Sequence, residues 1–74
     1  MKNRDFDRIR FGQNLRHARL ASGLTQAALA RKARLSENTV SRLERGLCGM
    51  SVLTFMSLVN ALETSPAQLL QGIE

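Results

Sequence analysis

The sequence predicts a single all-α domain built from five short helices. Three observations support this prediction. Apolar residues recur at helical spacing, hydroxyl residues stand before four of the apolar segments, and only short polar or glycine-containing connections separate them. A chain of 74 residues can bury one small core and leaves no room for a second. We therefore treat residues 1–74 as one compact domain.

The first helix is expected to run from about residue 7 to residue 22. A step of 100° per residue places Arg19 at the edge of its apolar face. Gly23 follows, and glycine readily takes the left-handed conformation that ends a helix. Residues 1–6 are expected to form a disordered N-terminal arm. The apolar face of this helix contains Phe11, Leu15 and Ala18.

The other four helices are each expected to begin after a hydroxyl side chain that can accept a backbone N–H bond. The second helix should end near residues 32–33, the third at Gly46 and the fourth at about Glu63. Pro66 fits the first turn of the fifth helix, where its missing N–H is not needed. The four predicted N-caps are Thr25, Ser36, Ser51 and Ser65.

Charge is divided unevenly along the chain, whose net charge is +5. Residues 1–46 hold all eleven basic residues and four acidic ones, a net charge of +7, whereas residues 47–74 hold two acidic residues and no basic ones. This asymmetry indicates a polyanion as the partner of one end of the molecule. The alternative is an ordinary solvated basic surface.

Other classes of function find little support in the sequence. One cysteine (Cys48) and one histidine (His17) offer neither an internal disulfide nor a metal site. We see no secretory signal, no membrane-spanning run, no nucleophile–base pair and no phosphate-binding glycine loop. We therefore expect a cytoplasmic protein that is not an enzyme and that uses no metal, cofactor or small-molecule ligand.

The third helix carries an acidic residue beside its apolar stripe. Val40 and Leu43 are its inward pair, and Glu44 lies next to them. A buried, unpaired carboxylate costs several kcal/mol, so a cation is expected beside it. Arg19 is the expected partner. The alternative is an exposed Glu44 that pairs locally with Arg45 or with Arg42.

The fourth helix is apolar over a much wider arc than a single core contact requires. We expect the surplus to be buried against a second copy of the chain. The alternative is a helix covered on both sides by the first and fifth helices. The residues expected in the dimer interface are Leu53, Met56, Val59, Leu69 and Leu70.

The segment LTQAALARKARLSENTVSRLERG, residues 24–46, resembles the helix-turn-helix of phage repressor and Cro proteins, the XRE family of DNA-binding regulators. The resemblance extends over roughly residues 8–72. It implies a repressor-like fold in which the second and third helices form the DNA-reading unit and Arg19 pairs with Glu44. The positions that carry the motif are Gln26, Ala30, Val40 and Leu43.

The same resemblance assigns DNA contacts along residues 36–45, the expected recognition helix. Arginine suits guanine, asparagine suits adenine and a carboxylate accepts from cytosine in the major groove. Two positions depart from the family: Arg34 stands where glycine is usual, and Ala28 stands where an acidic residue often completes a capping box with Thr25. The expected base-reading residues are Glu37, Asn38, Ser41 and Arg42. The expected phosphate contacts are Thr25, Gln26, Arg34, Ser36 and Arg45.

These features predict a homodimer that binds double-stranded DNA at an inverted-repeat operator and regulates transcription. Restriction–modification controller proteins are similar in size and in the run ERGLCGMSVLTF that follows the recognition helix. Cro-like phage repressors and antitoxins are alternatives within the same family. A protein-binding module that kept the fold without DNA binding is an alternative of another class, and a basic membrane-surface helix is a third.

Overall fold

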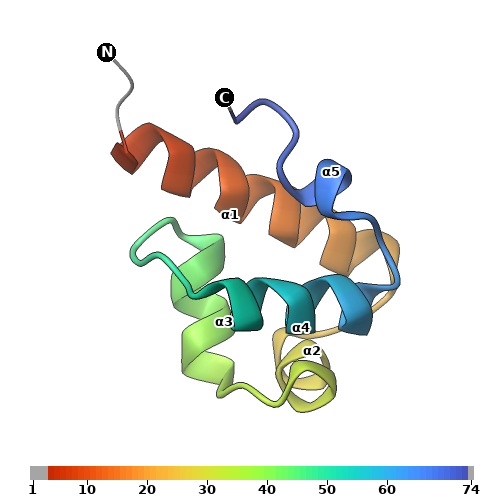
Figure 1. Cartoon of the computed structure of the whole chain (residues 1–74). Coiled ribbons are helices and arrows are strands. Elements are labelled where there is room, and N and C mark those ends of the chain that lie inside the picture. Colours follow the sequence, from red (N-terminus) through yellow and green to blue (C-terminus); the bar gives the residue numbers. More distant parts are fainter. Residues whose placement is uncertain (1–3, 74) are drawn as a thin grey trace.

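The computed structural model describes residues 4–73, and within this range it contains five helices and no strands (Figure 1). The prediction of an all-α five-helix domain is therefore confirmed. None of these helices has the length and apolar character needed to cross a membrane. The helices are α1 (Arg4–Ala21), α2 (Gln26–Ala33), α3 (Glu37–Glu44), α4 (Val52–Leu62) and α5 (Pro66–Leu69).

The first helix begins earlier than the sequence indicated. Residues 4–6 are helical, so the expected disordered arm is wrong for them, while residues 1–3 lie outside the described part of the chain. Asp5 and Asp7 occupy the first turn of α1, where carboxylates interact favourably with the helix dipole. Arg8 also pairs with Asp5 one turn away. Both interactions favour a helix that starts before residue 7.

The four predicted N-caps are all present. Each cap residue has extended backbone angles, and its hydroxyl oxygen accepts a bond from the N–H three residues later. The cap distances are 3.0 Å at Thr25 and at Ser36, 3.1 Å at Ser51 and 3.2 Å at Ser65. These bonds satisfy one otherwise unpaired donor at the start of each helix.

The helix ends use left-handed residues, two of which are not glycine. Gly23 and Gly46 follow α1 and α3 with φ of 71° and 73°. Arg34 ends α2 with φ of 59°, as its alignment with a glycine position indicated. Glu63 ends α4 with φ of 51°, which the sequence did not indicate. A side chain in this conformation costs roughly 1 kcal/mol or more relative to glycine.

The apolar core draws on all five helices. α1 packs on α3 and α5, and α2 packs on α3 and α4, so α1 and α2 lie on opposite sides of the molecule (Figure 1). Burying each large aliphatic side chain stabilises the fold by about 1.5–3 kcal/mol. The largest fully buried side chains are Leu15, Leu29, Val40, Leu43, Leu58 and Leu69.

Gly12 allows α1 to approach the C-terminal end of α3 closely. A Cβ atom at this position would lie 2.5 Å from the carbonyl oxygen of Glu44 and 2.6 Å from that of Leu43. Both atoms belong to backbone that cannot rotate away. A glycine in the middle of a helix weakens it by about 1 kcal/mol relative to alanine. Here the absence of a side chain sets the position of α3.

Candidate nucleic-acid interface

Helices α2 and α3 pack together around a three-residue turn that the structure defines closely. The N–H of Arg34 donates to carbonyl oxygens in the last turn of α2, and the N–H of Leu35 donates to the carbonyl of Ala30 at 2.8 Å. Ser36 then caps α3. The buried side chains of Ala30 and Val40 contribute to the shared core on the inner side of this unit. The turn therefore fixes the direction in which α3 leaves α2.

The outer face of α3 is polar and available to a partner. Glu37, Asn38 and Arg42 are exposed, and Ser41 is half-buried beside them. Within the described residues, the side chains of Glu37, Asn38 and Arg42 make no hydrogen bond or ion pair. Glu37 and Ser41 are four residues apart, as are Asn38 and Arg42, so the two pairs form adjacent rows on the outer side of α3. The structure thus brings together the four residues expected to read bases.

The expected phosphate contacts surround this face. Thr25, Ser36 and Arg34 are exposed. Thr25 and Ser36 are the N-caps of α2 and α3, and Arg34 is the C-cap of α2. Arg45 is also exposed, and its Nε donates to the carbonyl of Ser41 at 3.4 Å. Gln26 is half-buried, unlike the other four. The set therefore borders α3 from both of its ends.

A buried ion pair holds the C-terminal end of α3 against α1. Nε of Arg19 lies 2.6 Å from Oε2 of Glu44, and its Nη2 lies 3.1 Å from Oε1. Nη1 of Arg19 donates to the carbonyl of Leu24 at 2.9 Å. The two side chains are only 8% and 2% exposed. Arg19 is therefore the partner of Glu44, and the alternative of local pairing with Arg45 or Arg42 is wrong.

Sequence reasoning missed two contacts that support this arrangement. Nε2 of Gln26 donates to Oε1 of Glu44 at 3.1 Å, which joins the start of α2 to the ion pair. Nδ2 of Asn14 donates to the carbonyls of Leu69 and Gln71 at 2.9 and 2.8 Å, which ties the C-terminal segment to α1. Both contacts join residues far apart in the sequence. The one sequence signal for the Asn14 contact is its helical spacing from the core residues of α1, which places its side chain near the packed face of that helix.

The expected dimer surface needs correction. Val59 and Leu69 are only 5% and 0% exposed, so their side chains already belong to the core of one chain. Leu53, Met56 and Leu70 are 80%, 40% and 42% exposed, and Val52 is 76% exposed. The wide apolar arc of α4 therefore has two parts, of which one packs inward against α2 and α5. The other part is exposed and consists of Val52, Leu53 and Met56. Together with Leu70, which follows α5, these residues are the exposed apolar surface referred to below.

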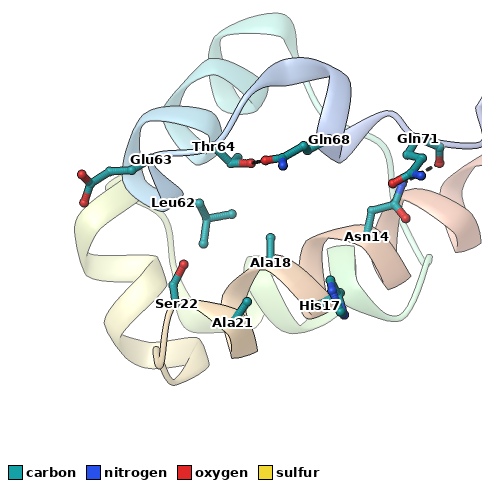
Figure 2. A pocket seen from close by; sticks show the side chains of 10 residues that line it. All are labelled: Asn14, His17, Ala18, Ala21, Ser22, Leu62, Glu63, Thr64, Gln68 and Gln71. Atoms are coloured by element: carbon teal, nitrogen blue, oxygen red, sulfur yellow. Dashed lines mark hydrogen bonds between the residues drawn. The ribbon is translucent and has the colours of Figure 1, made fainter.

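A groove of about 410 Å³ lies between α1 and the α4–α5 region, and no residue of α2 or α3 lines it (Figure 2). Thr64 and Gln68 are hydrogen-bonded on its α5 side, while His17 and Ala18 come from α1 (Figure 2). It is thus separate from the polar face of α3. The described residues also contain no cluster of His, Cys, Asp or Glu side chains that could hold a metal ion.

Two capped helices joined by a short turn, with the second helix presenting a free polar face, define a helix-turn-helix protein. The family model described as a helix-turn-helix domain matches residues 10–71. The chain therefore belongs to the helix-turn-helix regulators of the phage repressor and Cro type, the XRE family.

Several solved structures are similar to this chain over most of its length. The restriction–modification controller protein C.AhdI from Aeromonas hydrophila is 38% identical, with a TM-score of 0.84 over 86% of this chain and 97% of that one. The clp gene regulator ClgR from C. glutamicum is 36% identical, with a TM-score of 0.80 over 85% and 82%. No curated protein sequence matches the chain significantly.

The P22 c2 repressor has been crystallised with a synthetic operator. It is 31% identical, with a TM-score of 0.77 over 84% of this chain and 94% of that one. ClgR is a gene regulator and the c2 protein is a repressor. The present chain has the fold of such DNA-binding regulators.

Proposed function

We propose that this protein is a sequence-specific transcription regulator that binds double-stranded DNA with α3 in the major groove. The observation that carries the proposal is the row of exposed polar side chains on α3 that has no partner within the described structure. The major groove admits one α-helix and presents a distinct donor and acceptor pattern for each base pair. Arg42 suits guanine, Asn38 suits adenine and Glu37 suits cytosine.

The residues around α3 are suited to phosphate binding. The N-termini of α2 and α3 provide backbone N–H groups beside Thr25 and Ser36, and such groups favour anions. Arg34 and Arg45 add positive charge at the two ends of α3. Phosphate contacts fix the position of a protein on DNA without reading its sequence. Gln26 completes this proposed set.

We propose further that the protein acts as a homodimer on an inverted repeat. The exposed apolar surface of Val52, Leu53, Met56 and Leu70 is suited to burial against a second copy. Isologous dimers place two recognition helices about one DNA turn apart, roughly 34 Å, so the operator should have matching symmetry. A protein that regulates transcription works in the compartment that holds the DNA, which we take to be the cytoplasm.

Among regulators of this family, the role of restriction–modification controller is the one we favour. The likeness to C.AhdI covers 97% of that chain and 86% of this one, so it extends over nearly the whole domain. A phage-type repressor is the second candidate, supported by the likeness to the P22 c2 repressor, which covers 94% of that chain.

The test of DNA binding is a titration of mixed-sequence duplex DNA at several salt concentrations. We expect affinity to fall steeply with salt, because each neutralised phosphate contributes about one unit to the logarithmic slope. Arg45→Ala should reduce the slope by about one unit, whereas Arg16→Ala, on the exposed side of α1, should leave it unchanged. Weak binding with no salt dependence would favour a protein-binding module instead.

A further inference from the structure

Gln26 connects the proposed DNA-binding surface to the buried ion pair. It is the first residue of α2, and its side chain is half-buried. Its Nε2 donates to Oε1 of Glu44 at 3.1 Å. The amide therefore spans from the surface at the start of α2 to a carboxylate inside the molecule.

The carboxylate that receives this bond has a fixed position. Arg19 binds both oxygen atoms of Glu44 through Nε and Nη2, and its Nη1 binds the carbonyl of Leu24. Leu24 in turn lies two residues before Gln26 in the connection from α1 to α2. Arg19 thus ties together α1, the α1–α2 connection and the end of α3. A side chain that is hydrogen-bonded to Glu44 is therefore held in a fixed position relative to these three parts of the chain.

We propose that Glu44 is a positioning residue for DNA binding, which holds the side-chain amide of Gln26 ready for a phosphate. An amide nitrogen carries two N–H groups, and Glu44 uses one of them. The second N–H remains for a phosphate oxygen next to the backbone N–H groups of Gln26 and Ala27, which lack an intrahelical partner. This inference rests on the proposed DNA-binding function.

Holding the amide before DNA arrives should strengthen binding. A free glutamine side chain loses rotational freedom when it contacts a phosphate, and an amide already held by Glu44 loses less. The typical entropy of one such side chain corresponds to roughly a two- to tenfold change in affinity. A purely structural role, in which Gln26 only satisfies an acceptor on Glu44, predicts no coupling between the two residues in DNA affinity.

A double-mutant cycle separates these roles. Dissociation constants for a DNA duplex selected by the wild-type protein are measured for Gln26→Ala, Glu44→Gln and the double variant, each checked for folding by circular dichroism. We expect Glu44→Gln to weaken binding roughly two- to tenfold in the wild-type background and hardly at all beside Gln26→Ala. An equal loss in both backgrounds would overturn the proposal. Gln13→Ala, at an exposed position of α1, is the matched control.

Because Glu44→Gln can unfold the protein, a second measurement uses the wild-type chain alone. Nuclear magnetic resonance relaxation of the Gln26 side-chain amide should show an ordered group before DNA is added, with one of its two hydrogens exchanging slowly with solvent. The exposed amide of Gln13 should be mobile by the same measure. A Gln26 amide as mobile as that of Gln13 would overturn the proposal.

DNA titrations with the wild-type protein and with Gln26→Ala distinguish a wrong positioning role from a wrong DNA-binding function. If the wild-type protein binds the selected duplex and Gln26→Ala binds it equally well, the positioning role is wrong while DNA binding stands. If the wild-type protein binds no DNA in a salt-dependent manner, both proposals are wrong.

Discussion

Helices α3 and α4 are built alike, but the side chains on their outer faces differ in polarity. Each begins with a serine cap and packs one side on the common core. The outer face of α3 carries Glu37, Asn38 and Arg42, whereas that of α4 carries Leu53 and Met56. Polar groups that hydrogen-bond and apolar groups that exclude water suit different partners. The polar face of α3 is thus the surface that we propose for DNA, and the apolar face of α4 the one that we propose for a second copy of the chain.

The two helices also differ in how they are held. α4 is held by apolar packing, and α3 has in addition a buried ion pair and a close backbone contact with α1. An ion pair fixes geometry in a way that apolar contacts do not, because its atoms must meet at hydrogen-bond distance. A helix that reads base pairs requires such fixed geometry.

The largest expected effect concerns the ion pair that anchors α3. Glu44→Leu or Arg19→Met alone should lower the free energy of unfolding by about 3 kcal/mol, because each leaves a buried charged group without its partner. The double change Arg19→Met with Glu44→Leu should cost less than the sum. Urea unfolding measures all four proteins. Strictly additive losses would show that the pair does not act as a unit.

The next effect concerns the close contact between α1 and α3. Gly12→Ala would normally strengthen a helix by about 1 kcal/mol. Here its Cβ would meet the carbonyls of Leu43 and Glu44, so we expect a loss of about 1–3 kcal/mol in thermal or urea unfolding. Gln13→Ala is the control, with little change at an exposed site. A more stable Gly12→Ala protein would contradict the observed approach of the two helices.

Recognition by α3 is expected to depend on Arg42. Arg42→Ala should cost about 1–3 kcal/mol in binding and relax the base preference at one position of each half-site. Arg45→Ala should instead weaken binding to all sequences about equally, because phosphate contacts carry no sequence information. Both variants are titrated with a selected duplex and a random one. An equal loss on both duplexes for Arg42→Ala would make it a backbone contact.

The apolar surface of α4 should control association. Leu53→Lys or Met56→Lys should weaken the dimer at least tenfold, about 1.4 kcal/mol, and reduce DNA affinity with it. Gln13→Lys adds the same charge at an exposed position of α1, outside this surface, and should leave the dimer intact. Analytical ultracentrifugation gives the dissociation constants. A wild-type chain that stays monomeric at tens of micromolar would contradict the proposed dimer.

The smallest effects concern the two left-handed residues that end α2 and α4. Arg34→Gly and Glu63→Gly should each raise the free energy of unfolding, by up to about 1 kcal/mol, because glycine adopts positive φ without a side-chain clash. Thermal unfolding is sufficient to detect this gain. A clear loss at either position would mean that its side chain makes a contact worth more than the backbone strain.

Local features of the structure could be predicted from the sequence. Thr25, Ser36, Ser51 and Ser65 cap helices through bonds that span three residues, so neighbouring residue types suffice to identify them. The pairing of Arg19 with Glu44 could also be predicted, since a carboxylate beside an apolar stripe needs a cation.

Features that depend on the packing of distant segments could not be predicted in the same way. Leu53 and Val59 are equally apolar, and no periodicity on α4 tells which one faces the core. Glu63 gives no sign of its left-handed backbone, because glycine is the usual marker of that conformation. The bond between Gln26 and Glu44 depends on how α2 and α3 come together in three dimensions.

The most direct test of the claim that α3 reads DNA is selection of duplexes from a random pool by the purified protein. We expect enrichment of an inverted repeat whose half-site centres lie about one helical turn, roughly 34 Å, apart. The same selection with Arg42→Ala should lose preference at one position in each half-site. A pool that shows no enriched sequence after repeated rounds, with the wild-type protein folded throughout, would mean that α3 does not read a DNA sequence.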